Sequence, residues 1–179
     1  MIYEFLADGF EEMEALAPVD ILRRAGLSVT TVGVGGRLVT GAHGIPVTAD
    51  VSDADAVFSD MEAVILPGGM PGTRNLDRSP AVDKALEQAV AENAVIAAIC
   101  AAPSVLGHRG LLCGRRATCF PGFEAELTGA FVAGDAVVTD GRFVTARGAG
   151  VAVEFALTLV SVLVSPEKAK ELKETMQCR

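Results

Sequence analysis

The stretch that decides the fold is AVIAAICAAP, residues 94–103. Its first six residues are apolar, which is typical of a short strand buried on both faces of a sheet. Two alanines and a proline follow the cysteine, and they predict that a helix opens at about Ala102. Cys100 then lies on the turn between strand and helix, and its small neighbours make this turn resemble a nucleophile elbow.

Strand and helix patterns alternate on both sides of this stretch. Strands are expected at residues 2–7, 27–34, 63–66, 117–120, 136–139 and 143–146, helices at 11–25, 81–92, 151–164 and 166–176, and a hairpin-like excursion at 38–49. This order predicts an α/β fold in which a mainly parallel sheet has helices on both faces. No repeat or linker divides the chain, so residues 1–179 are expected to form a single domain.

Composition and net charge argue against nucleic acids and membranes as binding partners. Half of the 179 residues are apolar and the formal net charge is −8, a balance that disfavours binding to nucleic acids and to anionic membranes. The longest apolar stretch, 151–164, contains Glu154 and is shorter than the roughly 20 residues that span a bilayer. The start of the chain has no leader pattern, so we expect a cytoplasmic protein.

The four cysteines predict free thiols, because a domain of this size does not need disulfides and their spacing matches no metal-binding template. Cys100 is the candidate nucleophile, since a helix N-terminus after it favours the thiolate. The alternative is a buried structural cysteine. His43 and His108 are poorly placed to pair with Cys100, and no metal site is expected.

Glu14 is the candidate acid and base. On the first helix its stripe continues with Pro18, Ile21 and Ala25, so the carboxyl is expected to point inward and to have a raised pKa. A protonated carboxyl can donate a hydrogen bond to a thiolate and then move that proton. The alternative is a solvated glutamate that complements the helix dipole, the role expected of its neighbours in the first turn, Glu11 and Glu12.

Two further segments offer groups to a site at the ends of the strands. The amides of Gly68, Gly69 and Ala101 are candidates for stabilising an oxyanion, although glycines after a strand can also be simple turn residues. Arg147 follows the last strand and could hold an anion, or it could make an ordinary structural ion pair.

Several short motifs lie along the chain in a fixed order: ADGFEEME at 7–14, PVD at 18–20, RRAG at 23–26, LPGG at 66–69, AICAAP at 98–103 and RG at 147–148. Together they resemble the ThiJ/PfpI superfamily, and in particular the branch of the parkinsonism-associated deglycase and the bacterial YajL-like proteins. The resemblance implies a flavodoxin-like three-layer sandwich, a homodimer and no cofactor. It also implies an oxidation-prone Cys100 beside a protonated Glu14, with amides from Gly69 and Ala101 around the sulfur, and it makes Arg24 and Arg147 candidates for anion or structural support.

Two departures from the pattern of the superfamily bear on the chemistry. Ala101 stands where protease-like members have a histidine directly after the nucleophile, so a protease is disfavoured. Phe120 stands before Pro121, where the deglycase branch often has a histidine. Glu14 is therefore the remaining candidate for acid and base catalysis.

The resemblance and the residues favour a cysteine-dependent glyoxalase or deglycase. Such an enzyme, a lyase or a hydrolase, acts on methylglyoxal, glyoxal or their thiol and amine adducts, and releases a hydroxy acid. The alternative is a non-enzymatic oxidative-stress sensor or redox-regulated chaperone in which Cys100 is oxidised to a sulfinic acid.

Overall fold

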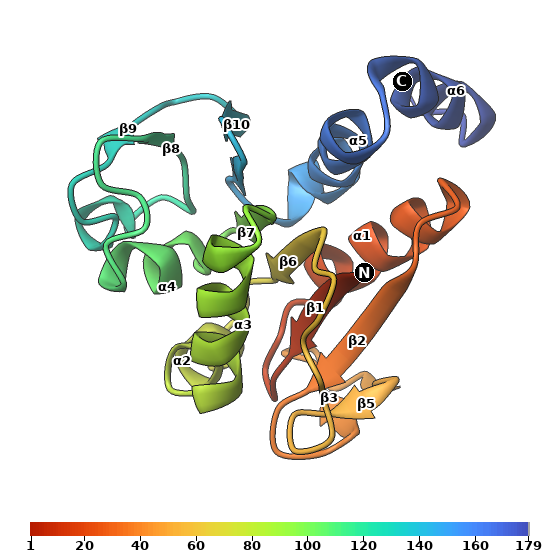
Figure 1. Cartoon of the computed structure of the whole chain (residues 1–179). Helices are drawn as coiled ribbons and strands as arrows, with labels where there is room; N and C mark the ends of the chain where they lie inside the picture. Colours follow the sequence, from red (N-terminus) through yellow and green to blue (C-terminus); the bar gives the residue numbers. More distant parts are fainter. Residues whose placement is uncertain (179) are drawn as a thin grey trace.

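A central sheet of seven strands organises the computed structural model, which describes residues 1–178 (Figure 1). The strand order is β10-β11-β7-β6-β1-β2-β5, and every pair is parallel except β10 with β11. The strands are β1 (Ile2–Leu6), β2 (Val29–Gly33), β5 (Val51–Ser52), β6 (Ala63–Leu66), β7 (Val95–Ile99), β10 (Val137–Asp140) and β11 (Phe143–Ala146). The central strands β1, β6 and β7 are buried along their whole length, as continuous apolar runs predict.

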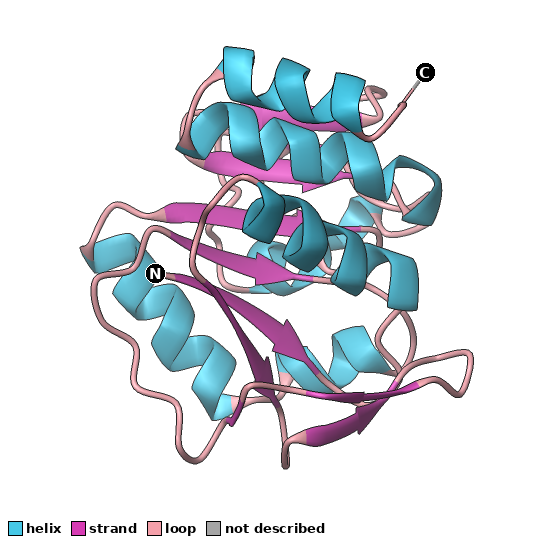
Figure 2. Ribbon diagram, turned by 90° about the vertical axis from the view of Figure 1, so that its right-hand side faces the viewer, coloured by secondary structure: helices cyan, strands magenta, loops and turns pink. Residues whose placement is uncertain are grey.

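Helices cover both faces of the sheet (Figures 1 and 2). One face packs against α1 (Glu12–Arg24) and α5 (Ala152–Leu163), and α6 (Pro166–Thr175) packs on α5. The other face packs against α2 (Gly72–Asp77), α3 (Pro80–Ala91) and α4 (Pro103–His108). Alternate residues of a strand point to opposite faces, so Ile65 joins the core under α1 and α5 while Val64 joins the core under α3. The predicted flavodoxin-like α/β sandwich is confirmed.

Short elements lie outside the main sheet. The predicted excursion at 38–49 is confirmed as an antiparallel hairpin, β3 (Leu38–Thr40) with β4 (Pro46–Thr48). A second pair joins β8 (Arg116–Ala117) and β9 (Phe131–Val132), and the 3₁₀ helices are η1 (Glu124–Glu126) and η2 (Ala149–Val151). Within residues 1–178, no helix is long and apolar enough to cross a membrane.

Two parts of the sequence-based prediction are wrong. The strand expected at 117–120 is limited to β8, because the next amides bond outside a ladder: Thr118 donates to the side chain of Thr145, and Phe120 donates to the carbonyl of Cys100. The helix α2 was not expected, because its six residues are too few to show an apolar period. The first helix runs through Pro18 without a break.

Candidate active site

The carboxyl ends of three adjacent strands, β1, β6 and β7, carry the loops in which the candidate residues lie. In a parallel sheet these ends share one edge, which is where ligands collect in open α/β folds. The loop after β1 leads into α1 and Glu14, the loop after β6 begins with Pro67, and the loop after β7 begins with Cys100. The order of the strands thus brings together residues that are 86 positions apart in the chain.

Cys100 has a left-handed backbone, with φ +65°, in the turn between β7 and α4. Residues other than glycine adopt this conformation at a cost of about 1–3 kcal/mol, and it concentrates at functional sites. The backbone N–H of Cys100 donates to the carbonyl of Ala146 at 2.8 Å, which fixes the turn against β11. The half-buried thiol is thereby held at the edge of the sheet, as expected for a nucleophile elbow.

Glu14, in the first turn of α1, is 1% exposed and meets the thiol. Its Oε2 accepts from the backbone N–H of Gly68 at 3.0 Å, and its carboxylate also accepts from the thiol of Cys100 and from the N–H of Ala149. Burial, which disfavours the charged form, raises the pKa of Glu14 to about 7. Glu14 therefore changes its protonation state close to neutral pH.

The thiol of Cys100 does not have the lowered pKa that the sequence suggested. Burial, followed by the charge and hydrogen bond of Glu14, raises the pKa of Cys100 to about 12. Amides of Gly69 and Ala101 donate to the sulfur and act in the opposite direction, but they are outweighed. The two groups therefore titrate as a coupled pair.

The three candidate oxyanion amides do not act alike. The amides of Gly69 and Ala101 donate to Cys100, whereas the N–H of Gly68 donates to Glu14. Gly68 has a second role, because the side chains of Cys100 and Glu14 both pack against its Cα. A Cβ at this position would lie 2.6 Å from the Cβ of Cys100 and 2.6 Å from Oε2 of Glu14, so the contact between the two residues requires a glycine.

Two backbone donors at the site were not foreseen from the sequence. Ala149 gives an amide to Glu14 from η2, in the turn between β11 and α5. Phe120 donates its backbone N–H to the carbonyl of Cys100 at 2.7 Å and has a side chain that is 47% exposed. The RGAG turn at 147–150 was a signal for the first, while the position of Phe120 depends on a long loop with no local pattern.

The structure does not bring the two candidate arginines to the thiol of Cys100. Arg24 makes an exposed ion pair with Asp20, one turn away on α1, at 2.7 Å. Arg147 is exposed, donates to the carbonyl of Gly134 at 3.4 Å and lines a cavity of about 200 Å³ beside Cys119. All four cysteines are free, as predicted.

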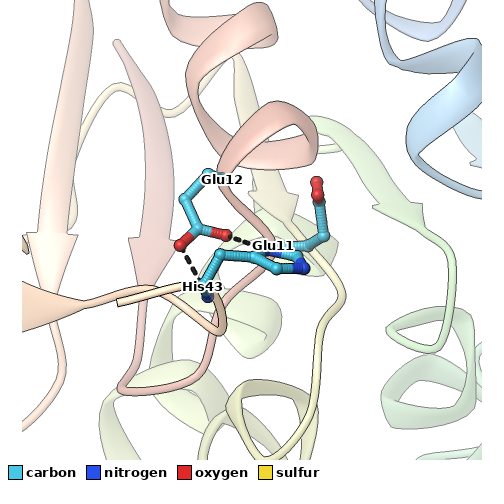
Figure 3. A group of neighbouring side chains, drawn as sticks. All are labelled: Glu11, Glu12 and His43. Atoms are coloured by element: carbon cyan, nitrogen blue, oxygen red, sulfur yellow. Dashed lines mark hydrogen bonds and ion pairs between the residues drawn. The ribbon is translucent and has the colours of Figure 1, made fainter. Parts of the chain in front are cut away.

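A second polar cluster lies next to the site and joins α1 to the β3–β4 hairpin (Figure 3). The carboxylate of Glu12 accepts from the backbone N–H of His43 and pairs with its Nδ1, both at 2.8 Å. Glu12 is buried, contrary to the solvated position expected for it. Glu11 lies close enough for the three side chains to surround a metal ion, but it caps α1 by accepting from the N–H of Glu14 at 2.8 Å. Structural hydrogen bonds account for this cluster.

A family model described as the DJ-1/PfpI family matches residues 1–162. Protein dj-1beta of Drosophila melanogaster is 38% identical over 170 residues, which cover 93% of this chain and 91% of that protein. The glutathione-independent glyoxalase DJR-1.2 of Caenorhabditis elegans is 35% identical over 164 residues, which cover 90% of this chain and 87% of that protein.

Solved structures have the same fold over nearly the whole chain. The crystal structure of Drosophila melanogaster DJ-1beta superimposes with a TM-score of 0.93 at 34% identity, covering 99% of this chain and 97% of that one. The structure of Toxoplasma gondii DJ-1, described as oxidized, has a TM-score of 0.90 at 32% identity and covers 98% of this chain and 97% of that one.

Proposed function

The chain belongs to the DJ-1/PfpI family, and from this premise we propose that it is a cofactor-independent glyoxalase or deglycase that uses Cys100 and Glu14. Its substrates are small reactive carbonyls such as methylglyoxal and glyoxal, or their adducts with thiols and amines. The glyoxalase named among its relatives supports this class of substrate. The observation that carries the proposal is the contact between the strained Cys100 and a carboxyl whose pKa is about 7.

The first step is addition of the thiol to the aldehyde. The sulfur of Cys100 forms a bond to the aldehyde carbon while its proton passes to the carboxylate of Glu14, which then protonates the aldehyde oxygen and leaves a hemithioacetal. The transfer is short because the thiol already donates to Glu14. The amides of Gly69 and Ala101, which face the sulfur, support the developing negative charge.

The second step moves a proton between two carbons. Glu14 removes the proton from the former aldehyde carbon, the neighbouring carbonyl becomes an enediol, and protonation of that neighbouring carbon gives a thioester of the hydroxy acid. Water hydrolyses the thioester to lactate, in the case of methylglyoxal, and restores the thiol. With adducts, the thiol or amine is released as well. Glu14 ends in its starting state, so the cycle needs no external acid or base.

The test is lactate formation from methylglyoxal without glutathione. We expect the wild type to form lactate and Cys100→Ser to form none, because the weaker nucleophile has no base strong enough to activate it. Cys113→Ser is the matched control, since Cys113 is an exposed free thiol and should leave the rate unchanged. Full activity in Cys100→Ser, or a fully reduced wild type without activity, would refute the proposal.

A second candidate function is redox sensing, with Cys100 oxidised to a sulfinic acid. It is favoured by the two amides and the carboxyl around the sulfur, which can hold the added oxygens. Intact-mass and peptide analysis after graded peroxide should then place the first two oxygens on Cys100, ahead of Cys113, Cys119 and Cys178. Oxidation spread evenly over the four thiols would remove this candidate.

We also propose a homodimer and a cytoplasmic location. Exposed apolar side chains on the packed helices α1 and α5 support the dimer; they are Met13, Leu16 and Val153. A surface of this kind lowers its free energy when a second copy covers it. Sedimentation at micromolar concentration should show a dimer that Leu16→Glu dissociates, and a purely monomeric wild type would contradict the proposal.

A further inference from the structure

Two loops that contribute to the Cys100 site carry exposed apolar side chains. Met70 directly follows Gly69, whose amide donates to the sulfur, and its side chain is 40% exposed. Phe120 donates its backbone N–H to the carbonyl of Cys100 at 2.7 Å, and 47% of its surface is exposed. Of the two, Phe120 is the residue that the fold brings to Cys100 from a distant loop, and its side chain forms the apolar rim considered below.

The ring of Phe120 lies close to the acid as well as to the nucleophile. A Cβ at Gly148 would be 3.3 Å from Cδ2 of Phe120 and 3.9 Å from Oε1 of Glu14, so the ring and the carboxyl flank the same glycine. The backbone bond to Cys100 keeps the residue in place whatever its side chain. The ring is therefore a neighbour of the carboxyl of Glu14 as well as of the Cys100 turn.

The charges near the reacting atoms are negative. The charge of Glu14 raises the pKa of Cys100, and the charge of Glu11 raises the pKa of Glu14. Arg24 pairs with Asp20, and the exposed guanidinium of Arg147 donates to the carbonyl of Gly134 and does not act on the Cys100–Glu14 pair. An anionic group on the substrate would meet like charge and an aromatic face, both of which disfavour its binding.

We propose that Phe120 is a specificity-determining residue, whose ring selects reactive carbonyls that carry an apolar, uncharged substituent. Aryl- and alkyl-substituted α-oxoaldehydes fit this rim, and α-oxoaldehydes bearing a carboxylate do not. The inference rests on the proposed attack of Cys100 on an aldehyde, and it adds which part of the substrate the protein recognises.

The first test does not require turnover. Alkylation rates of Cys100 with iodoacetamide, N-benzyliodoacetamide and iodoacetate are measured on its peptide by mass spectrometry and divided by the rates for N-acetylcysteine. Because all three reagents attack the same sulfur, their ratios cancel any change in thiol pKa. We expect the wild type to favour the benzyl reagent, and Phe120→Ala to lower this preference about 3- to 10-fold, as for one lost aromatic contact.

Two variants keep this test decisive. Phe120→Leu retains an apolar side chain and should keep part of the preference even if Phe120→Ala folds poorly. Phe131→Ala removes a phenylalanine that is 67% exposed on β9, and it should leave the ratios unchanged. A wild type with the same ratios as N-acetylcysteine, or a preference of full wild-type size in both Phe120→Ala and Phe120→Leu, overturns the inference.

The second test is turnover of phenylglyoxal against para-carboxyphenylglyoxal, which differ only in the charge on the ring. We expect the wild type to have the higher kcat/KM for phenylglyoxal and Phe120→Ala to lose this advantage. Turnover of both substrates at equal rates overturns the inference and leaves the proposed function standing. If no α-oxoaldehyde is turned over, the proposed function is refuted. The alkylation ratios then still test whether Phe120 favours apolar groups at Cys100.

Discussion

The first turn of α1 carries two buried carboxyls, Glu12 and Glu14, that have opposite acid strengths. Burial raises the pKa of Glu12, but several hydrogen bonds, the strongest of them from His43, outweigh this effect and lower it. Burial dominates at Glu14 and raises its pKa to about 7. Two residues correspond to about 200° around a helix, so the side chains point to different neighbours, one to the β3–β4 hairpin and the other to Cys100.

The comparison teaches that burial alone does not decide the charge of a carboxyl. Glu4, in the middle of β1, is the extreme case of a buried carboxyl. It is fully buried, and neither of its oxygens has a hydrogen-bond partner. Burial accordingly raises the pKa of Glu4 well above its usual range. From Glu12 through Glu14 to Glu4, the pKa rises as the hydrogen-bond donors become fewer or weaker.

The largest effect is expected on activity, which should depend on the carboxyl of Glu14 and not on that of Glu12. Activity needs the carboxylate of Glu14, so kcat/KM of the wild type should rise as pH increases through about 7. Glu14→Gln should lose about 10²–10⁴-fold in kcat/KM and the step in the pH profile as well. Glu12→Gln is the control and should retain the step. A step near pH 7 in Glu14→Gln would show that another group titrates.

The next effect concerns the contact between Glu14 and Cys100. Gly68→Ala would place a Cβ 2.6 Å from atoms of both residues, so one of them must move. A displacement of about 1 Å can cost on the order of 100-fold in rate, and we expect a loss of this size in kcat/KM. Gly134→Ala meets no atom within 4 Å and should behave like the wild type. Equal activity of the two variants would contradict the geometry of the site.

A smaller effect, on stability, tests Glu4. Its pKa is higher in the folded than in the unfolded chain, so its contribution to stability is complete below the unfolded pKa and decreases as pH rises toward the folded pKa. Glu4→Leu should therefore raise the free energy of unfolding by about 1–3 kcal/mol near neutral pH. Denaturant titrations should show the difference from wild type shrinking as pH falls to about 4. A difference independent of pH would mean that Glu4 does not titrate.

The smallest effect is expected at Glu12. Its pKa is lowered in the folded chain, so its contribution to stability is present above the unfolded pKa and is lost as pH falls through the folded pKa. Glu12→Gln should lower Tm by about 2–4 °C at neutral pH, the size of one weakened interaction in a chain of this length. The loss should vanish at low pH in thermal scans. Glu11→Gln, which keeps a side-chain acceptor for the N–H of Glu14, is the matched control.

Parts of the site could be predicted because they depend on local pattern. Cys100 follows an apolar strand and precedes small residues, and Glu14 lies on an otherwise apolar helix stripe, so both could be singled out from their neighbours in the chain. The contact between them was implied only by the resemblance. It arises because β1, β6 and β7 are adjacent and parallel, which sets their following loops side by side.

Other expectations failed because they depend on distant partners. The amide of Gly68 was assigned to an oxyanion, but it donates to Glu14 from another loop. Cys100 was expected to favour the thiolate, but burial and the charge of Glu14 outweigh its amide donors. Glu12 was expected in solvent, but the β3–β4 hairpin folds over it and supplies His43.

The sequence by itself determined the alternation of strands and helices, the two-sided burial of the sheet, and the cysteine and glutamate that the turns present. Apolar period and turn residues encode these features within a few neighbouring positions. Only the tertiary structure decided which donor meets which acceptor, and hence that Glu14 titrates near neutral pH while Glu12 is held charged. The physical reason is that a pKa depends on burial and on partners within a few ångströms, and the fold draws those partners from loops far apart in the chain.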